Sequence, residues 1–343
     1  MKSLVVEKQG VLAFKDMPLQ GEMTPDSLRI QIKNVGICGS DVHYYTHGRI
    51  GQYIVKEPMI LGHEAAGIVL EVGSNVKNFK PGDRVCMEPG IPNPKSRAAK
   101  LGLYNLDPDV FFWATPPDHG CLIEEVIHPA DYTYKLPENV SLAEGAMVEP
   151  LAIGLQAAKK ARIMPGDNAV VIGAGTIGIM CAISLLSGGC SQVFVVDNKQ
   201  EKLDIASSYQ GIIPLNFTKT DPLKAVMDAT DNWGCEVVVE ASGAPAVYPG
   251  FADYGCPGGK VVLVGIPVDP VPFDIAGIQA KELDMASVFR YANIYPRAIN
   301  LIASGKLDVK RLISKVYPFD QAIDAFKLAE QNQANIVKIM IEL

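Results

Sequence analysis

A glycine-rich turn near the middle of the chain constrains the fold more than any other feature of the sequence. The apolar run 169–172 leads into Gly173, Gly175 and Gly178, spaced as G-x-G-x-x-G, and a stretch with helical periodicity follows. An apolar run without polar alternation is typical of a parallel strand that is covered on both faces. The sequence therefore predicts a strand, a tight turn and a helix, the first unit of a doubly wound sheet.

The pattern of apolar and polar residues along the chain changes near Glu149. Before that point, short alternating segments lie between Gly, Pro and Asp turns and predict a β-rich module. After it, we expect apolar strands at 169–172, 192–197, 236–240, 260–265 and 285–289. The pattern alone leaves open whether the chain from residue 291 closes this sheet or returns to the β-rich module.

The glycine turn has the features of a dinucleotide site. Its three glycines allow a tight bend, a close approach of the backbone to a pyrophosphate, and close packing of helix on strand. The phosphates would lie at the positive end of the helix dipole. Asp197 ends the next strand 19 residues after Gly178, where a carboxylate accepts ribose hydroxyls and repels a 2′-phosphate. We therefore expect NAD rather than NADP, a preference that cations at Lys199 and Lys202 would weaken.

A second group of residues carries metal-binding side chains. Cys38, His63 and Glu64 supply a thiol, an imidazole and a carboxylate within 26 positions, and zinc accepts all three at catalytic sites that keep an open coordination position. Taken singly, each is more often a structural residue. In a chain that also has a dinucleotide turn, the set predicts zinc-assisted hydride transfer.

Composition excludes several classes of partner. The net charge of −7 and the lack of a basic block argue against binding to nucleic acid or to anionic membranes. The seven cysteines have no paired spacing, which favours a reducing compartment, and we expect a cytoplasmic protein. No apolar run approaches the roughly 20 residues of a membrane span.

Two longer patterns resemble the zinc-containing medium-chain dehydrogenase/reductase family. They are Gly-Ile-Cys-Gly-Ser-Asp-Val-His at 36–43 and Gly-His-Glu-x2-Gly-x5-Gly-x2-Val at 62–76. The resemblance covers essentially the whole chain and implies an α/β fold with two domains. A GroES-like β-rich catalytic domain would comprise residues 1–150 and 286–343, and a NAD-binding Rossmann domain with a doubly wound parallel sheet would comprise residues 151–285.

Within that family the chain is most similar to the polyol dehydrogenases of the sorbitol (L-iditol) and xylitol type. The segments that carry this similarity are 43–45, 48–51, 104–106, 114–118, 148–151 and 288–291. The resemblance implies reversible oxidation of a polyol to a ketose with NAD. It leaves open whether the substrate is sorbitol, xylitol or another polyol, and another secondary alcohol or threonine is the alternative.

The resemblance also implies roles for individual residues around one catalytic zinc. Cys38, His63 and Glu64 would bind the metal directly. The sequence leaves open whether Glu149 binds the metal directly or through water. Because two carboxylates and a thiolate exceed the charge of Zn²⁺, we expect Glu149 to act through water. Ser40 would accept the substrate proton and relay it through the NAD ribose to His43, since histidine titrates near neutral pH.

The remaining implied positions concern the substrate and the cofactor. The residues implied to bind the polyol are Tyr44, Glu149, Arg290 and Tyr291. The residues implied to line the NAD site are Gly173, Gly175, Ile177, Gly178, Asp197, Lys202, Val264, Gly265, Ile266, Val288, Phe289 and Arg290.

One loop departs from the family pattern. Many relatives hold a structural zinc with four cysteines after Glu88, and the corresponding positions here are Asn93, Ser96, Ala99 and Asp107. Such side chains are poor zinc ligands. We therefore expect no structural zinc, a loop held by packing or by a subunit contact, and a homotetramer or homodimer.

Overall fold

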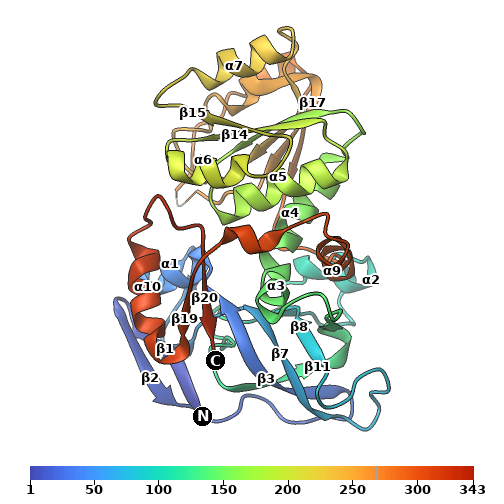
Figure 1. Cartoon of the computed structure of the whole chain (residues 1–343), viewed down its shortest axis with the longest axis vertical. Helices are drawn as coiled ribbons and strands as arrows, with labels where there is room; N and C mark the ends of the chain where they lie inside the picture. The colour runs from blue at the N-terminus through green and yellow to red at the C-terminus, as the bar shows by residue number, and fades with distance from the viewer. Residues whose placement is uncertain (268) are drawn as a thin grey trace. The chain divides into compact units, whose positions relative to one another are not determined.

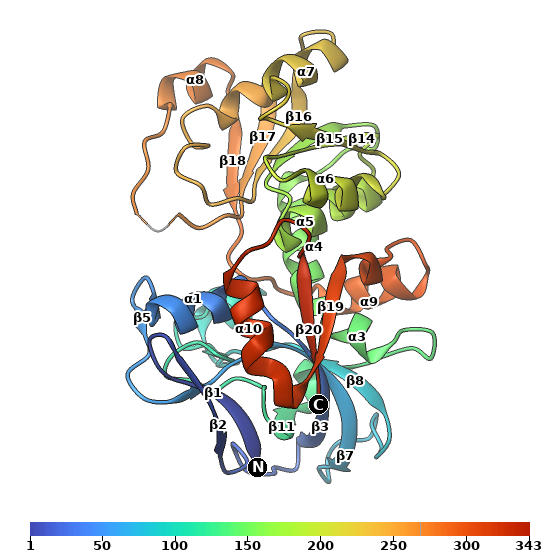
Figure 2. The same cartoon turned by 60° about the vertical axis from the view of Figure 1, so that its left-hand side comes forward.

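The computed structural model describes residues 1–267 and 269–343, which form two compact units. The first unit comprises Met1–Glu149 and Tyr295–Leu343, and the second comprises Pro150–Ile294. The second unit continues beyond the predicted boundary at residue 285, because β18 (Asp284–Ser287) still pairs in parallel with β17 (Gly255–Leu263) (Figure 2).

The first unit is built on a seven-stranded sheet with the order β12-β8-β7-β3-β20-β19 and with β11 paired to β3. The strands of this unit are β1 (Lys2–Lys8), β2 (Val11–Asp16), β3 (Ser27–Gly36), β4 (Arg49–Ile50), β5 (Tyr53–Ile54), β6 (Met59–Ile60), β7 (Glu64–Val72), β8 (Arg84–Met87), β9 (Gly90–Ile91), β10 (Phe111–Phe112), β11 (Glu125–Pro129), β12 (Thr133–Lys135), β19 (Ile313–Pro318) and β20 (Lys338–Glu342). Strand β20 pairs antiparallel with β3, so the late part of the chain returns to the β-rich module (Figure 1).

Helices of this unit are short and pack beside the sheet. They are α1 (Gly39–His47), α2 (Arg97–Lys100), α3 (Leu142–Ala146), α9 (Tyr295–Ala303) and α10 (Ala322–Glu330), with 3₁₀ turns η1 (Tyr104–Leu106), η2 (Ala130–Tyr132), η4 (Val309–Leu312) and η5 (Phe319–Gln321). Alternate residues of β3, namely Leu28, Ile30 and Ile32, are buried in one core cluster with Phe326 of α10. The period of two along β3 therefore fixes which face of the sheet is buried.

The second unit has a six-stranded parallel sheet with the order β15-β14-β13-β16-β17-β18. The other elements are β13 (Asn168–Ile172), β14 (Gln192–Asp197), β15 (Ile212–Asn216), β16 (Cys235–Glu240), α5 (Thr176–Gly188), α6 (Gln200–Ser207), α7 (Pro222–Ala229), α8 (Ile275–Ala280) and the 3₁₀ turn η3 (Phe251–Tyr254). Helix α4 (Val148–Ala161) carries the chain into this unit. The doubly wound parallel sheet that the sequence predicts is confirmed.

The strand order reverses between β13 and β16. Cofactors bind at the carboxyl ends of the strands at such a switch point. At this switch point the glycine turn at 173–178 follows β13, and the 240–243 loop follows β16. Among the described residues, no helix is both long and apolar enough to cross a membrane.

Candidate metal centre and dinucleotide site

The three predicted zinc ligands lie together in the first unit. One ligand atom each from Cys38, His63 and Glu64 lie within 4.8 Å of one another. Cys38 is the residue before the first turn of α1, and Glu64 begins β7, where it pairs with Gly36 of β3. The segment that follows β3 and the segment that leads into the neighbouring strand β7 therefore bring a thiol, an imidazole and a carboxylate to one point.

Asp41 holds these two segments together. Its side chain is fully buried and accepts hydrogen bonds from the backbone N–H of Cys38 (3.1 Å) and of Gly62 (3.0 Å). Its Oδ1 also lies 3.7 Å from Nδ1 of His63. Asp41 was not among the predicted site residues, although its position three residues after Cys38, in the first turn of a helix, is a capping pattern.

The environment of His63 favours a cation at this point. Burial alone would lower the pKa of His63, but the negative charges of Asp41 and Cys38 hold that pKa well above its usual value. Among the described residues, Nδ1 of this buried ring has no hydrogen-bond partner. A metal ion bound to one ring nitrogen would supply the positive charge that this environment favours. Asp41 would accept a hydrogen bond from the other ring nitrogen, so both nitrogens would have partners. The donor set thus fits zinc.

Glu64 is engaged by a lysine from the other end of the sequence. Nζ of Lys338, on β20, lies 2.8 and 2.7 Å from the two carboxylate oxygens and donates to the carbonyl of Ile37 at 2.9 Å. Burial lowers the pKa of Lys338, but Glu64, Cys38 and Glu149 together raise it above its ordinary value. Gly36 is required beside this pair, because a Cβ there would lie 2.1 Å from Glu64 Oε2.

The residues predicted to bind substrate are divided between the two units. Tyr44 and Glu149 are buried in the first unit, and Glu149 lies in the first turn of α4. Arg290 and Tyr291 belong to the second unit. Arg290 has a φ of 58°, an unusual value for a side chain with a Cβ, and its guanidinium lies 5.0 Å from the Phe289 ring centroid.

The predicted proton relay lies on one helix. Ser40 and His43 are three residues apart on α1, a spacing that places side chains on one helical face. Ser40 is half-buried and His43 is exposed. Partial burial and the neighbouring His47, whose ring centroid is 5.3 Å away, lower the pKa of His43.

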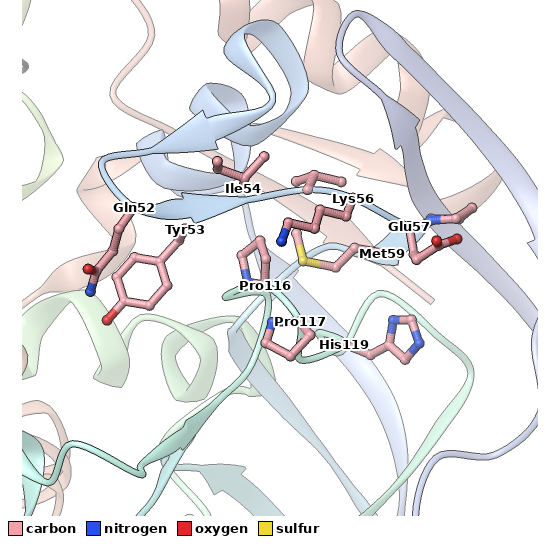
Figure 3. Close-up of a pocket in the computed structure, with 11 residues that line it drawn as sticks. Gln52, Tyr53, Ile54, Lys56, Glu57, Met59, Pro116, Pro117 and His119 are labelled. Carbon is pink, nitrogen blue, oxygen red and sulfur yellow. The ribbon is translucent and has the colours of Figure 1, made fainter.

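A cavity of about 460 Å³ lies in the first unit between the segments 52–59 and 116–119. Figure 3 shows Lys56 and Met59 turned toward Pro116 and Pro117, with the hydroxyl of Tyr53 pointing away from them. None of the candidate metal ligands lines this cavity. The size of this cavity does not identify a reaction. The assignment of the reaction therefore rests on the cluster of Cys38, His63 and Glu64.

The glycine turn of the second unit has the geometry that the sequence predicts. Gly173 has a φ of 108°, and a Cβ on Gly178 would lie 1.8 Å from the carbonyl oxygen of Gly173. A Cβ on Gly175 would meet nothing within 4 Å. Gly173 is required for its positive φ, and Gly178 is required because a side chain would clash with the Gly173 carbonyl. Gly175 borders open space that a pyrophosphate can approach.

Asp197 is fixed beside this turn. Its Oδ2 accepts from the backbone N–H of Ala174 at 2.7 Å and its Oδ1 from that of Lys199 at 2.9 Å. Burial and the charge of Lys199 lower the pKa of Lys202, although Asp197 opposes this. The carboxylate therefore has a defined orientation at the carboxyl end of β14, close to Lys199 and Lys202.

The remaining predicted cofactor residues lie at the ends of two strands. The backbone N–H groups of Val264 and Gly265 donate to the carbonyl of Glu240 at 2.8 and 2.9 Å, and that of Val288 donates to Leu263 at 2.9 Å. Ile266 and Phe289 are exposed. Ile177 is half-buried at the start of α5.

The loop without cysteines is held by hydrogen bonds. Asp107, which is buried, accepts from the backbone N–H of Asn93 at 2.6 Å, and the Ser96 hydroxyl accepts from that of Ala99 at 3.1 Å. The phenol of Tyr104 donates to the buried carboxyl of Glu88 at 2.7 Å. Ser96 and Asp107, two of the four positions that the family resemblance compares with cysteines, therefore help to close the loop by hydrogen bonds.

Comparison with known proteins identifies the family. Residues 24–138 match the alcohol dehydrogenase GroES-like domain, and residues 176–304 match the zinc-binding dehydrogenase domain. The chain belongs to the zinc-containing medium-chain dehydrogenase/reductase family, as the sequence predicts. Its relatives within that family include proteins named for polyol and ketose substrates.

Three similar proteins span nearly the whole chain. A putative D-xylulose reductase of Rhizobium meliloti is 58% identical over 100% of this chain and 99% of its own length. Human sorbitol dehydrogenase is 39% identical over 99% of this chain and 95% of its own length. The crystal structure of an Escherichia coli oxidoreductase/dehydrogenase of unknown specificity superposes with a TM-score of 0.95 at 34% identity, covering 99% of this chain and 98% of the other.

Proposed function

We propose that this chain is a polyol dehydrogenase that interconverts xylitol and D-xylulose with NAD at one zinc ion. The observation that carries the proposal is the cluster of Cys38, His63 and Glu64, whose ligand atoms lie within 4.8 Å of one another in a chain that also has the dinucleotide turn. The choice of xylitol is supported by the 58% identity to a putative D-xylulose reductase, against 39% to a sorbitol dehydrogenase.

When bound, zinc would act as a Lewis acid that lowers the pKa of the substrate hydroxyl, and NAD would accept the hydride. Cys38, His63 and Glu64 would hold the metal, and Asp41 would orient His63. Glu149, which is buried nearby, would act through water. The secondary alcohol loses a hydride and a proton and becomes the ketone of the ketose.

The proton would leave along α1. Ser40 would accept it and pass it on to His43. Because His43 is exposed and its pKa is lowered by partial burial and by His47, it can release the proton to solvent near neutral pH. The reverse route would supply a proton for ketose reduction.

The polar groups implied to bind substrate suit a polyol. Tyr44, Glu149, Arg290 and Tyr291, the residues that the family resemblance implies for substrate binding, would offer partners to several hydroxyls. A substrate with a single hydroxyl has one donor and two acceptor lone pairs, so it could hydrogen-bond to only a few of these groups. This argument favours a polyol over a simple alcohol.

Asp197 supports NAD over NADP. Its carboxylate, fixed by two backbone N–H groups, would accept the ribose hydroxyls and repel a 2′-phosphate. The loop closed by Asp107 supports a single zinc per chain. A homotetramer or homodimer and a cytoplasmic location remain predictions.

The test is the rate of NAD reduction by zinc-loaded protein with xylitol, sorbitol, ribitol, 2-propanol and L-threonine. Xylitol should have the highest kcat/KM, and NADH oxidation by D-xylulose should proceed. A higher value for sorbitol would contradict the choice of polyol. A preference for threonine or 2-propanol would contradict the substrate class.

A further inference from the structure

Glu240 ends the central strand β16 and is fully buried. Its Oε1 accepts hydrogen bonds from the backbone N–H of Ser242 at 2.8 Å, from that of Gly243 at 3.0 Å, and from the Ser242 hydroxyl. Oε2 accepts from the phenol of Tyr248 at 2.9 Å. A buried carboxylate with this many donors fixes the path of the backbone around it.

Tyr248 connects this carboxylate to the neighbouring turn. Its hydroxyl also lies 3.2 Å from the carbonyl oxygen of Gly265. Its buried ring packs against Phe251 and Phe273, with ring centroids 6.1 and 6.2 Å away. One phenol therefore joins Glu240 to the 264–266 turn, and two aromatic rings hold that phenol in place.

The 240–243 loop lies against both parts of the proposed NAD site. A Cβ on Gly173 would lie 3.1 Å from the backbone nitrogen of Ser242, so the loop touches the glycine turn. On its other side, a Cβ on Gly265 would lie 2.3 Å from the nitrogen of Gly243 and 2.4 Å from Glu240 Oε2. The loop is thus packed backbone to backbone between the glycine turn and the 264–266 turn.

We propose that Glu240 and Tyr248 are a positioning pair that sets the backbone on which the nicotinamide half of the cofactor rests. The inference rests on the proposed function. Hydride transfer tolerates little displacement of the reacting atoms. The pair holds the 264–266 turn at a fixed distance from the 240–243 loop, at the switch point of the sheet. The adenosine half depends on other residues, namely the glycine turn and Asp197.

The test uses Tyr248→Phe, which keeps the ring and removes the hydroxyl. Tyr254→Phe is the matched control, because Tyr254 packs against the same core cluster but lies at the amino end of β17. The measurements are the dissociation constants of NADH, by its fluorescence, and of ADP-ribose, by competition, together with kcat for polyol oxidation by the zinc-loaded enzyme.

Tyr248→Phe should weaken NADH about tenfold and lower kcat, because Glu240 loses the buried phenol O–H that donates to it and the Gly265 carbonyl loses its contact with the same hydroxyl. ADP-ribose affinity should stay within about twofold, and Tyr254→Phe should change neither. Glu240→Gln, which can still accept from Ser242 and Gly243, should lose less than Tyr248→Phe.

Equal loss of NADH and ADP-ribose affinity would overturn the inference, because it would indicate general damage to the unit. Unchanged NADH affinity and kcat in Tyr248→Phe would also overturn it. A wild-type chain that binds no NADH would instead refute the proposed function, and the inference with it.

Discussion

Nζ of Lys338 contacts both carboxylate oxygens of Glu64, at 2.8 and 2.7 Å, and the two side chains are only 2% and 1% exposed. This pair reduces the negative charge at the metal centre. Cys38, Glu64, Glu149 and the buried Asp41 would contribute four negative charges when ionised, against two positive charges from Zn²⁺. Lys338 supplies a third positive charge, so the net negative charge of the centre is smaller with this lysine than without it.

Lys338→Met should therefore destabilise the metal-free protein and strengthen the binding of zinc. Without zinc, a buried and unpaired Glu64 should lower the free energy of unfolding by about 3–5 kcal/mol. With zinc, the removal of a nearby cation should tighten metal binding about tenfold.

Urea unfolding of the metal-free protein and competition with a chelator measure these two effects. Lys315→Met, at an exposed position on β19, is the control. Weaker zinc binding in Lys338→Met would refute this assignment of charge.

Asp197→Ala should change the choice of cofactor. The variant loses the carboxylate that would accept the ribose hydroxyls, so kcat/KM for NAD should fall about 10- to 100-fold, and the ratio of NADP to NAD activity should rise. Asp204→Ala, on the exposed face of α6, should behave as wild type. The measurement is kcat/KM for NAD and for NADP in the variant and in the wild type. An unchanged ratio of NADP to NAD activity would contradict the role of Asp197.

Glu88 makes stability depend on pH. Burial raises the pKa of its carboxyl from 4.5 to about 7. Between these values the folded state holds a proton that the unfolded state has lost. The free energy of unfolding should therefore fall by up to about 3 kcal/mol as pH rises from 4.5 to 7.

Glu88→Gln should remove this dependence, so the variant gains stability relative to wild type between pH 5 and pH 8. Denaturant unfolding at both pH values gives the difference, with the exposed Glu138→Gln as control. A difference between Glu88→Gln and wild type that is the same at both pH values would show that Glu88 does not titrate in this range.

Metal content tests the loop that closes on Asp107. Elemental analysis should find one zinc per chain in the wild type and none in Cys38→Ala. Asp107→Ala should lower the free energy of unfolding by about 1–3 kcal/mol, because the backbone N–H of Asn93 loses its acceptor, with zinc content unchanged. A second zinc that survives in Cys38→Ala would refute the hydrogen-bonded loop as a replacement for metal.

Local spacing in the sequence was enough to predict much of this molecule. Gly173 and Gly178 needed only the G-x-G-x-x-G pattern after an apolar strand, since the steric demands act between neighbours in the sequence. The position of Asp197 at the end of the next strand could be predicted because one helix and one strand account for the 19 residues after Gly178. The Cys38, His63 and Glu64 cluster followed from the family patterns, and the structure brings these residues together.

Residues that act over long separations were not predicted. Lys338 lies 274 positions from Glu64, and nothing local to β20 indicates that its ammonium is buried. Tyr248 and Glu240 have no motif of their own, because their role depends on how the 264–266 turn packs. The second unit extends to Ile294 rather than ending at residue 285 partly because β18 pairs with β17, which is a tertiary contact.

The order of residues around Glu64 has a consequence for synthesis on the ribosome. Cys38, His63 and Glu64 emerge first, the second unit follows as one continuous segment, and Lys338 emerges only after it. During that interval the nascent chain presents a thiol and a carboxylate without their lysine partner. The centre should then bind metal ions more readily than it does in the finished protein, so zinc can be captured before folding is complete.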